Sequence, residues 1–427
     1  MALADYVCPM AQLSDDCFAM GGPMRSVEEA VALIVTRLSP VEGVETVALS
    51  DADGRVLARD LAAPLNLPPF TNSAVDGYAV RGEDLPAGEA RAFVVAARTQ
   101  AGAAAGAPVP PGQAIRIFTG APMPPGADTV FMQEDVSLDH EGRAELPAGL
   151  KRGSNVRPAG EDIAEGKMVL AAGRRLRPQD VGVLAALGLT NVEVRRRVRV
   201  AVFSNGDEIV QPGAARGPSQ LYDSNRFMLA AMLRRLGCEV TDLGILPDEA
   251  SEIAAILEQG AAAHDLILTS GGVSTGDADY VKTAIEQVGA MVFWRMAIKP
   301  GRPVAMGVIK GCPFIGLPGN PVAAFVTFAK VARPAIYALA GADWRKPVGT
   351  QVRAAFTYRK KPGRLEYVRA SVRRGEDGVW EAVKFPREGA GLLSSLIDTD
   401  GLVELSEDLT TIEPGRMVEF LAYSSLL

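Results

Sequence analysis

The chain has 427 residues, of which 48% are hydrophobic and 22% are charged, the composition of an ordinary globular protein with about three domains. A net charge of −7 argues against non-specific binding to nucleic acids, which needs a basic surface. Only two histidines are present, and the four cysteines form no Cys-x-x-Cys pair, which excludes His-ligated zinc catalysis, iron–sulfur clusters and zinc ribbons.

Neither a signal peptide nor a membrane span is expected. Aspartates interrupt the N-terminal segment, and the best apolar stretch, 325–339, carries Lys330 and Arg333 and is too short to cross a bilayer. Scattered cysteines fit a reducing compartment. We therefore predict a cytoplasmic protein that binds neither nucleic acid nor membrane.

The first half of the chain predicts two helices and many short strands. A capping-box pattern at 26–29 starts the first helix, whose apolar residues continue at helical spacing up to Pro40. From about 64 to 159, proline and glycine interrupt short β-type runs, which indicates a small β-rich domain. A second helix over 179–187 precedes a strand over 191–197.

Strands and helices alternate over 198–346, which predicts a mostly parallel sheet with helices on both faces. The expected strands are 198–203, 239–246, 266–269, 291–298 and 314–317, and the expected helices are 225–236, 249–262, 278–288 and 322–339. From 347 to 427 the pattern returns to short alternating strands, which predicts a small barrel or sandwich.

Polar, glycine-rich segments follow several of these strands, at 204–208, 270–280, 299–303 and 317–321. Ligands of open α/β sheets bind beyond the carboxyl ends of the strands, where glycines allow close approach and helix N-termini offer free N–H groups to anions. The segment 270–280 therefore predicts a phosphate or oxyanion cradle, with a tight strand-to-helix turn as the alternative. No lysine follows its glycines, so it is not a P-loop.

Charged side chains gather in the same segments. Carboxylates are the ligands that Mg²⁺ prefers, and five of them fall at loop positions: Asp207, Glu208, Asp248, Asp277 and Asp279. One or two of these, Asp248 above all, could instead be helix caps. The cations Arg295, Lys299 and Arg302 lie nearby in the sequence. Acidic and basic clusters together suggest a metal and an anion bound side by side, with structural salt bridges as the alternative.

Six segments carry a family resemblance, although each of those in the first half, read alone, is an ordinary polar turn. In chain order they are Asn-Ser-Ala-Val-Asp-Gly-Tyr-Ala at 72–79, Thr-Gly-Ala-Pro-Met-Pro-Pro-Gly-Ala-Asp at 119–128, Gly-Asp-Glu at 206–208, Ser-Gly-Gly-Val-Ser-Thr-Gly-Asp-Ala-Asp-Tyr at 270–280, Lys-Pro-Gly-Arg-Pro at 299–303 and Leu-Pro-Gly-Asn-Pro at 317–321. Together they resemble the molybdopterin molybdenumtransferases, the MoeA family, which includes the gephyrin E domain. The resemblance covers about 26–425.

The resemblance implies a fold and an activity. Members insert molybdate into adenylated molybdopterin with Mg²⁺, releasing AMP and molybdenum cofactor, and act as homodimers with the site between subunits. The implied fold is multidomain α/β plus β, in four parts: an elongated discontinuous domain over 26–63 and 160–197, a β-rich domain over 64–159, a central MogA-like α/β domain over 198–346 and a C-terminal β-barrel over 347–427. Transient contacts with the molybdopterin adenylyltransferase and with molybdoenzyme chaperones would follow.

The motifs carry the family's site residues onto this chain. The implied catalytic residues are Asp76, Thr119, Glu208, Asp248, Asp279 and Lys299, and Mg²⁺ would be held by Glu208, Asp248 and Asp279. The implied substrate-binding residues are Arg157, Asn225, Gly271, Gly272, Ser274, Gly276, Asp277, Arg295, Arg302, Pro318, Gly319, Asn320 and Arg369.

The sequence departs from the family pattern at four positions. Val75 stands where Met is frequent and Arg295 where a second Lys is usual, while Ala323 and Ala390 replace common serines. Those serines are hydrogen-bond donors near the oxyanion in relatives, so we expect weak molybdate binding here. Two other functions stay open at this point: a gephyrin-like scaffold without full activity, and a molybdopterin adenylyltransferase.

Overall fold

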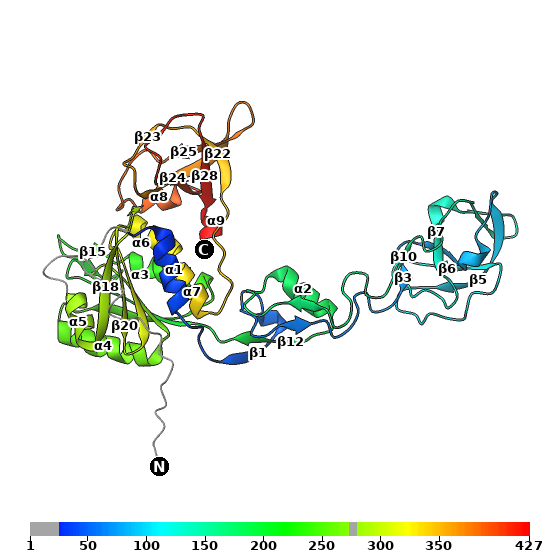
Figure 1. Ribbon diagram of the computed structural model, residues 1–427, viewed down its shortest axis with the longest axis horizontal. Helices are drawn as coiled ribbons and strands as arrows, with labels where there is room; N and C mark the ends of the chain where they lie inside the picture. Colours follow the sequence, from blue (N-terminus) through cyan, green and yellow to red (C-terminus); the bar gives the residue numbers. More distant parts are fainter. Residues whose placement is uncertain (1–24, 273–279) are drawn as a thin grey trace, which may run out of the picture.

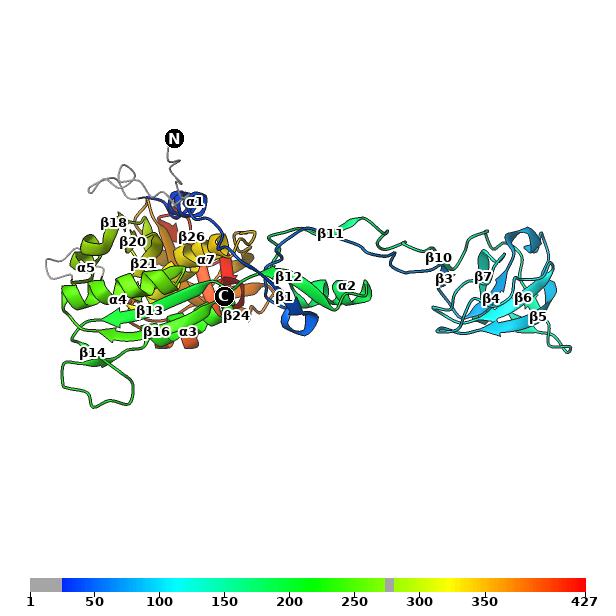
Figure 2. The ribbon, with the colours of Figure 1, turned by 90° about the horizontal axis from the view of Figure 1, so that it is seen from below.

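The structure is a computed structural model that describes residues 25–272 and 280–427. Figures 1 and 2 show a large body at one end, a small β unit at the other, and an extended arm between them. The predicted multidomain α/β plus β architecture is confirmed, while the exact domain boundaries stay predictions.

The arm consists of two chain segments that run side by side in opposite directions. The pairs are β1 (Val44–Ala48) with β12 (Asn191–Arg195), β2 (Leu61–Ala62) with β11 (Met168–Leu170), and β3 (Asn72–Ser73) with β10 (Val156–Arg157), all antiparallel. The helix α2 (Pro178–Ala186) buries Leu184 against Leu57, Leu176 and Val194 of the arm. The chain thus leaves the body, builds the small β unit and returns along its own path.

The small β unit is one six-stranded sheet in the order β7-β4-β6-β5-β9-β8. Its strands are β4 (Gly77–Val80), β5 (Arg91–Thr99), β6 (Gln113–Ile117), β7 (Thr129–Met132), β8 (Ser137–Leu138) and β9 (Ala144–Leu146). Phe93, Phe131 and Leu146 form its fully buried centre. Between β4 and β9 the structure has strands and short turns but no long helix, as the frequent prolines and glycines predicted.

The body contains a six-stranded α/β sheet in the order β16-β13-β17-β21-β20-β18. Its parallel strands are β13 (Arg199–Asn205), β16 (Glu239–Leu246), β17 (Leu266–Ser270) and β21 (Cys312–Leu317), and its antiparallel edge is made by β18 (Gly289–Arg295) and β20 (Pro303–Ile309). The expectation of a mostly parallel sheet is confirmed. The antiparallel strand β20 was not predicted, and the expected strand 291–298 ends early, at Arg295.

Alternate residues of β13 supply two cores, one on each face of this sheet. Val200 and Val202 pack with α1 (Val27–Arg37), α3 (Asn225–Arg235) and the long helix described next. Ala201 and Phe203 pack on the opposite face with α4 (Ala250–Ala263) and α5 (Tyr280–Val288). This alternation follows from the strand period of two and explains why all four residues are apolar.

The long helix runs from Pro321 to Leu339 as α6 (Pro321–Thr327), a π-helical turn (Phe328–Ala332) and α7 (Arg333–Leu339). It has 19 residues and, within the described part of the chain, is the single helix long and apolar enough to cross a membrane. The expectation that this stretch is too short was wrong. However, 89% of its apolar window is buried inside the protein, and the core helix of a soluble protein passes the same test.

The C-terminal strands close into a ring. The order β24-β25-β22-β28-β26 returns to β24 through a further β24–β26 pairing, which makes a five-stranded barrel. The strands are β22 (Thr350–Ala354), β24 (Leu365–Arg374), β25 (Trp380–Lys384), β26 (Gly401–Leu405) and β28 (Met417–Ala422), with β23 (Tyr358–Arg359), β27 (Thr411–Ile412), α8 (Ser394–Ile397) and α9 (Tyr423–Leu426) around them. The barrel lies directly against the α/β sheet and its helices (Figure 1).

A strand from the α/β half joins the barrel sheet. After β18 ends, β19 (Ile298–Lys299) pairs in parallel with β24 of the barrel, with Lys299 opposite Glu366. The backbone N–H of Leu365 also donates to the carbonyl of Ala297, at 2.8 Å. The segment that carries Lys299 is therefore held by the barrel and not, as predicted, by the end of a strand within the α/β sheet.

A buried ion pair joins the long helix to the barrel. Lys330 Nζ lies 2.8 Å from a carboxylate oxygen of Glu404, and both side chains are less than one-tenth exposed. The ammonium also lies 4.7 Å from the centre of the Tyr367 ring. Burial works to raise the pKa of Glu404, but the charge and hydrogen bond of Lys330, together with Lys346 and Tyr367, lower it overall. Burial also lowers the pKa of Lys330, against the charge of Glu404, and the short contact between the two groups is that of an ion pair.

Glu404→Gln should therefore destabilise the joint between helix and barrel by about 3–5 kcal/mol, because it leaves the buried Lys330 charge without a carboxylate. Urea unfolding of the full chain at pH 7 measures the loss. The exposed pair of Lys310 and Glu258, 3.2 Å apart, provides the control, since Glu258→Gln should cost at most about 1 kcal/mol. Equal shifts in the two variants would contradict the burial argument.

Candidate functional site

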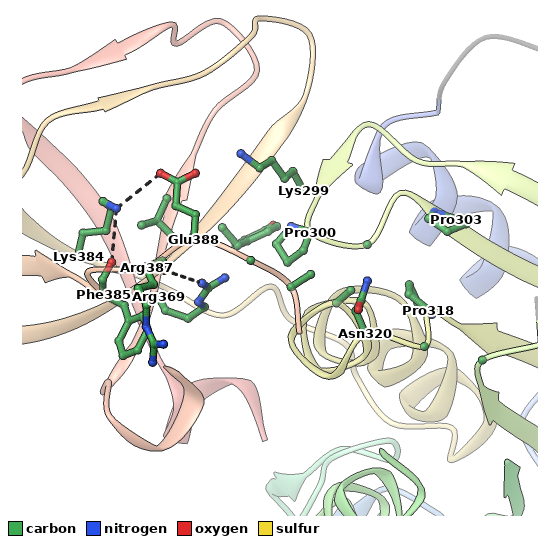
Figure 3. A pocket seen from close by; sticks show the side chains of 18 of the residues that line it. Lys299, Pro300, Pro303, Pro318, Asn320, Arg369, Lys384, Phe385, Arg387 and Glu388 are labelled. Carbon is green, nitrogen blue, oxygen red and sulfur yellow. Dashed lines mark hydrogen bonds and ion pairs between the residues drawn. The ribbon is translucent and has the colours of Figure 1, made fainter. Parts of the chain in front are cut away.

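A pocket of about 540 Å³ lies between the α/β sheet and the barrel. Figure 3 shows Lys299 and Asn320 on its α/β side and Arg369, Lys384 and Arg387 on its barrel side. From the α/β half the lining is Glu208, Gly271, Gly272, Lys299, Pro300, Gly301, Pro303, Pro318, Gly319, Asn320 and Ala323. From the barrel half it is Tyr358, Tyr367, Val368, Arg369, Lys384, Phe385, Arg387, Glu388, Gly389 and Ala390.

The predicted glycine cradle lies in this pocket. Gly271 and Gly272 follow β17, and the Pro318-Gly319-Asn320 turn follows the adjacent strand β21. Gly272 has a φ of +62°, and a Cβ there would meet the amide group of Asn205 at 2.1 Å. Glycine is therefore the residue that fits this position without displacing Asn205, and the binding of an anion there stays a prediction. Ser274, Gly276 and Asp277 lie outside the described residues.

Asn225 braces the cradle from behind and does not line the pocket. Its side-chain N–H₂ group donates to the Ser270 hydroxyl at 2.9 Å and to the Gly319 carbonyl at 2.6 Å. These two bonds tie the ends of neighbouring strands together. Asn225 thus supports the turn, and its direct contact with substrate stays a prediction.

Three of the predicted acidic residues follow β13 and β16: Asp207, Glu208 and Asp248. Glu208 lines the pocket, and one Asp248 oxygen accepts from the Asp207 backbone N–H at 3.2 Å. The other Asp248 oxygen is buried and makes no hydrogen bond of good geometry among the described residues, although the Asn205 side chain also acts on this carboxylate. Burial, then the charges of Asp207 and Glu208, raise the pKa of Asp248. A divalent cation would relieve both the unpaired oxygen and the repulsion, so these residues fit Mg²⁺.

No group of three metal-ligating side chains occurs within 25–272 and 280–427. Asp279, the third predicted Mg²⁺ ligand, lies outside that part of the chain.

Lys299 and Arg369 bring two positive charges into the pocket. Lys299 Nζ donates to the Tyr358 hydroxyl at 3.0 Å and lies 3.3 Å from Glu366. Burial works to lower the pKa of Lys299, but the bond to Tyr358 and the carboxylate of Glu366 raise it overall, so the side chain is cationic. Arg369 donates to the Arg387 carbonyl at 3.3 Å, while its buried Nε finds no acceptor in the described part of the chain.

One predicted cation, Arg302, does not line the pocket, and the side chain of a second, Arg295, is not among those that the structure describes. Arg302 is exposed and does not line the pocket, because the chain crosses into β20 at that point. Arg295 is the last residue of β18, paired with Pro303, and its side chain lies outside the described part. By contrast, Ala323 and Ala390 both line the pocket, where the Val322 N–H donates to the Ala390 carbonyl at 3.0 Å.

The barrel supplies lining residues that the sequence analysis did not single out. They are Tyr358, Tyr367, Lys384, Phe385, Arg387 and Glu388, and Lys384 lies 3.6 Å from Glu388. Arg369 falls in a strongly basic stretch, 353–374, with eight Lys or Arg and one acid. That basic stretch was the sequence signal for an anion-binding surface on the barrel. Charge alone did not distinguish such a surface from one that faces solvent.

Asp76, Thr119 and Arg157 form a separate group in the small β unit. One Asp76 oxygen accepts from the Thr119 backbone N–H at 2.8 Å and from its hydroxyl at 2.7 Å. These bonds, the backbone one first, lower the pKa of Asp76 and keep it ionised. Arg157 is exposed on β10, which pairs with β3 just before Asp76. Both views place this unit at the far end of the arm from the pocket (Figures 1 and 2).

Family models match most of the chain. Residues 25–188 match the MoeA N-terminal region (domain I and II), 201–338 match a probable molybdopterin binding domain, and 351–423 match the MoeA C-terminal region (domain IV). The three matches follow one another in the order of the arm, the α/β sheet and the barrel.

Full-length relatives agree with the models. The molybdopterin molybdenumtransferase of Haemophilus influenzae is 38% identical over 95% of this chain and 100% of its own length, and that of Nostoc sp. is 36% identical over 93% of each. The crystal structure of a molybdopterin biosynthesis MoeA protein from Pyrococcus horikoshii is 30% identical, covers 94% of this chain and 100% of its own, and has a TM-score of 0.79. This chain therefore belongs to the MoeA family of molybdopterin molybdenumtransferases, which acts in molybdenum cofactor biosynthesis.

Proposed function

We propose that this chain inserts molybdate into adenylated molybdopterin and releases AMP and molybdenum cofactor. The observation that carries the proposal is the pocket that Lys299 and Arg369 line together with the glycine cradle of Gly271 and Gly272. Molybdate is a tetrahedral dianion, which two cations can neutralise. At about 540 Å³ the pocket has room for a small oxyanion and for part of a larger substrate beside it.

The cationic side chains and the backbone N–H groups of the pocket can bind different anionic groups of the substrates. Lys299 donates to Tyr358 and contacts Glu366, which leaves an N–H donor for the oxyanion, and Arg369 adds a second positive charge to the lining. Such donors stabilise an anion strongly because they are already oriented before it arrives. Backbone N–H groups of the glycine turn can bind a phosphate in the same way.

Mg²⁺ belongs to the proposal as well. Glu208 and Asp248 would hold it, together with Asp279. When bound, the metal would offset negative charge that develops as the phosphoanhydride of the adenylated substrate breaks.

We propose a homodimer in which the small β unit of one copy completes the pocket of the other. The arm supports this, because it carries Asp76 and Thr119 far from Lys299 of the same chain (Figures 1 and 2). Two hydrogen bonds from Thr119 orient the ionised Asp76 carboxylate, and Asp76 does not line the pocket that contains Lys299. A scaffold or an adenylyltransferase would not require this pairing of Asp76 with Thr119. Cytoplasmic location and transient partners stay predictions.

Lys299→Ala should lower the rate of molybdate-dependent AMP release from adenylated molybdopterin by about 10²–10³, because it removes an oriented charged donor. The assay measures AMP with and without molybdate. Lys310→Ala, which removes an exposed lysine in the turn between β20 and β21, serves as control. Turnover at the wild-type level in Lys299→Ala would refute the role of this lysine.

Ala323→Ser combined with Ala390→Ser should lower the molybdate concentration that gives half-maximal rate. Both positions line the pocket, and a hydrogen bond to a charged group contributes roughly 1.5–3 kcal/mol. A tenfold decrease or more is expected from two added donors. An unchanged half-saturating concentration would show that these positions do not contact the anion.

Mixing two inactive variants tests the shared site. Asp76→Ala and Lys299→Ala each damage every site of their own homodimer, but a mixed dimer concentrates both changes in one site and leaves the other intact. After dissociation and free mixing, about a quarter of wild-type activity should return, since half the dimers are mixed and half their sites are whole. Verified mixing without any recovery of activity would mean that each copy works alone.

A further inference from the structure

Contacts with the barrel determine the position of Lys299. Its backbone runs beside β24, with Lys299 opposite Glu366, although the residues before and after it belong to strands of the α/β sheet. The ammonium group then contacts two barrel side chains, Tyr358 and Glu366. The barrel therefore fixes both the backbone and the tip of this lysine.

The hydrogen bonds of these side chains have a fixed direction. Glu366 is fully buried, and its two oxygens accept from Tyr358 OH at 2.8 Å and from Arg364 Nε at 2.7 Å. A phenol has one O–H hydrogen, so Tyr358 must present a lone pair to Lys299 and accept from it. The chain Lys299 to Tyr358 to Glu366 thus has a donor and an acceptor at every step.

We propose that Tyr358 and Glu366 are positioning residues for Lys299, which hold its ammonium group at the pocket wall with its remaining N–H donor directed at a bound tetrahedral oxyanion. Without them the lysine, whose side chain is 42% exposed, would sample many rotamers. The proposal rests on the proposed function and adds two residues to its anion site. Neither residue needs to touch the oxyanion.

Charge alone predicts the opposite effect for Glu366. Removing its negative charge makes the pocket more positive, which by itself would strengthen the binding of molybdate. Positioning predicts weaker binding, because a glutamine in its place offers a single acceptor oxygen to two donors, Tyr358 and Arg364. The sign of the change in Glu366→Gln therefore separates the two effects.

The test measures the Kd of molybdate for the full-length protein by calorimetry, with tungstate as a second probe. Tyr358→Phe, which keeps the ring and loses the hydroxyl, should raise the Kd about tenfold, near the lower end of what a hydrogen bond to a charged group contributes. Glu366→Gln should raise the Kd as well. Tyr337→Phe is the matched control: it removes a hydroxyl that Arg175 contacts at 3.2 Å, Tyr337 does not line the pocket, and the Kd should stay unchanged.

A double-mutant cycle shows whether Tyr358 acts through Lys299. In a Lys299→Ala background, Tyr358→Phe should change the Kd by less than about twofold, since the residue that it positions is absent. Equal effects of Tyr358→Phe with and without Lys299 would overturn the proposal, as would tighter molybdate binding by Glu366→Gln. In the AMP-release assay the half-saturating molybdate concentration should rise with the Kd, whereas kcat at saturation should change less.

The outcomes also separate this proposal from the proposed function. If Lys299→Ala weakens molybdate binding and Tyr358→Phe does not, the positioning role is wrong and the anion site stands. If the wild-type protein binds no molybdate, both are wrong. Circular dichroism and thermal unfolding of each variant identify a misfolded protein, and Tyr358→Phe keeps the test valid if Glu366→Gln does not fold.

Discussion

The pairing of β19 with β24 is the contact on which the pocket depends. It takes two residues out of the α/β half and hydrogen-bonds them to a barrel strand, which places Lys299 opposite Glu366. The same barrel strand carries Tyr367 and Arg369 into the pocket lining. One strand thus sets the position of both cations, and the buried pair of Lys330 and Glu404 holds the two halves together behind it.

Several kinds of contact hold the barrel against the α/β sheet, whereas the arm extends away from both (Figure 2). The barrel and the α/β sheet share strand pairing, a buried ion pair and apolar contacts, so the pocket forms within a single chain. The arm meets the body near Arg175, which donates to the Tyr337 hydroxyl and the Arg235 carbonyl, and it holds the small β unit at a distance (Figure 2). The proposed homodimer would bring the Asp76 and Thr119 pair of this unit to a pocket.

Local sequence patterns predicted much of this fold. They did not predict the features that depend on pairing between strands distant in the sequence. The strand and helix alternation over 198–346, the barrel and the glycine turn at Gly271 and Gly272 have local signals, and all are present. The strand β20 and the transfer of Lys299 to the barrel have none, because each depends on a partner strand elsewhere in the chain. Because β20 was not predicted, Arg302 was expected in the pocket, but it does not line it. Barrel residues such as Tyr358 and Arg387 carry no motif that marks them as lining.

The central claim is that the seam between the α/β sheet and the barrel binds the oxyanion. A crystal structure of the protein with tungstate, whose anomalous scattering locates the metal directly, tests it. We expect one dominant tungsten peak within the pocket, with its oxygens in hydrogen-bonding distance of Lys299 and Arg369. A protein that binds tungstate in solution but shows the peak elsewhere, away from both side chains, would contradict the account.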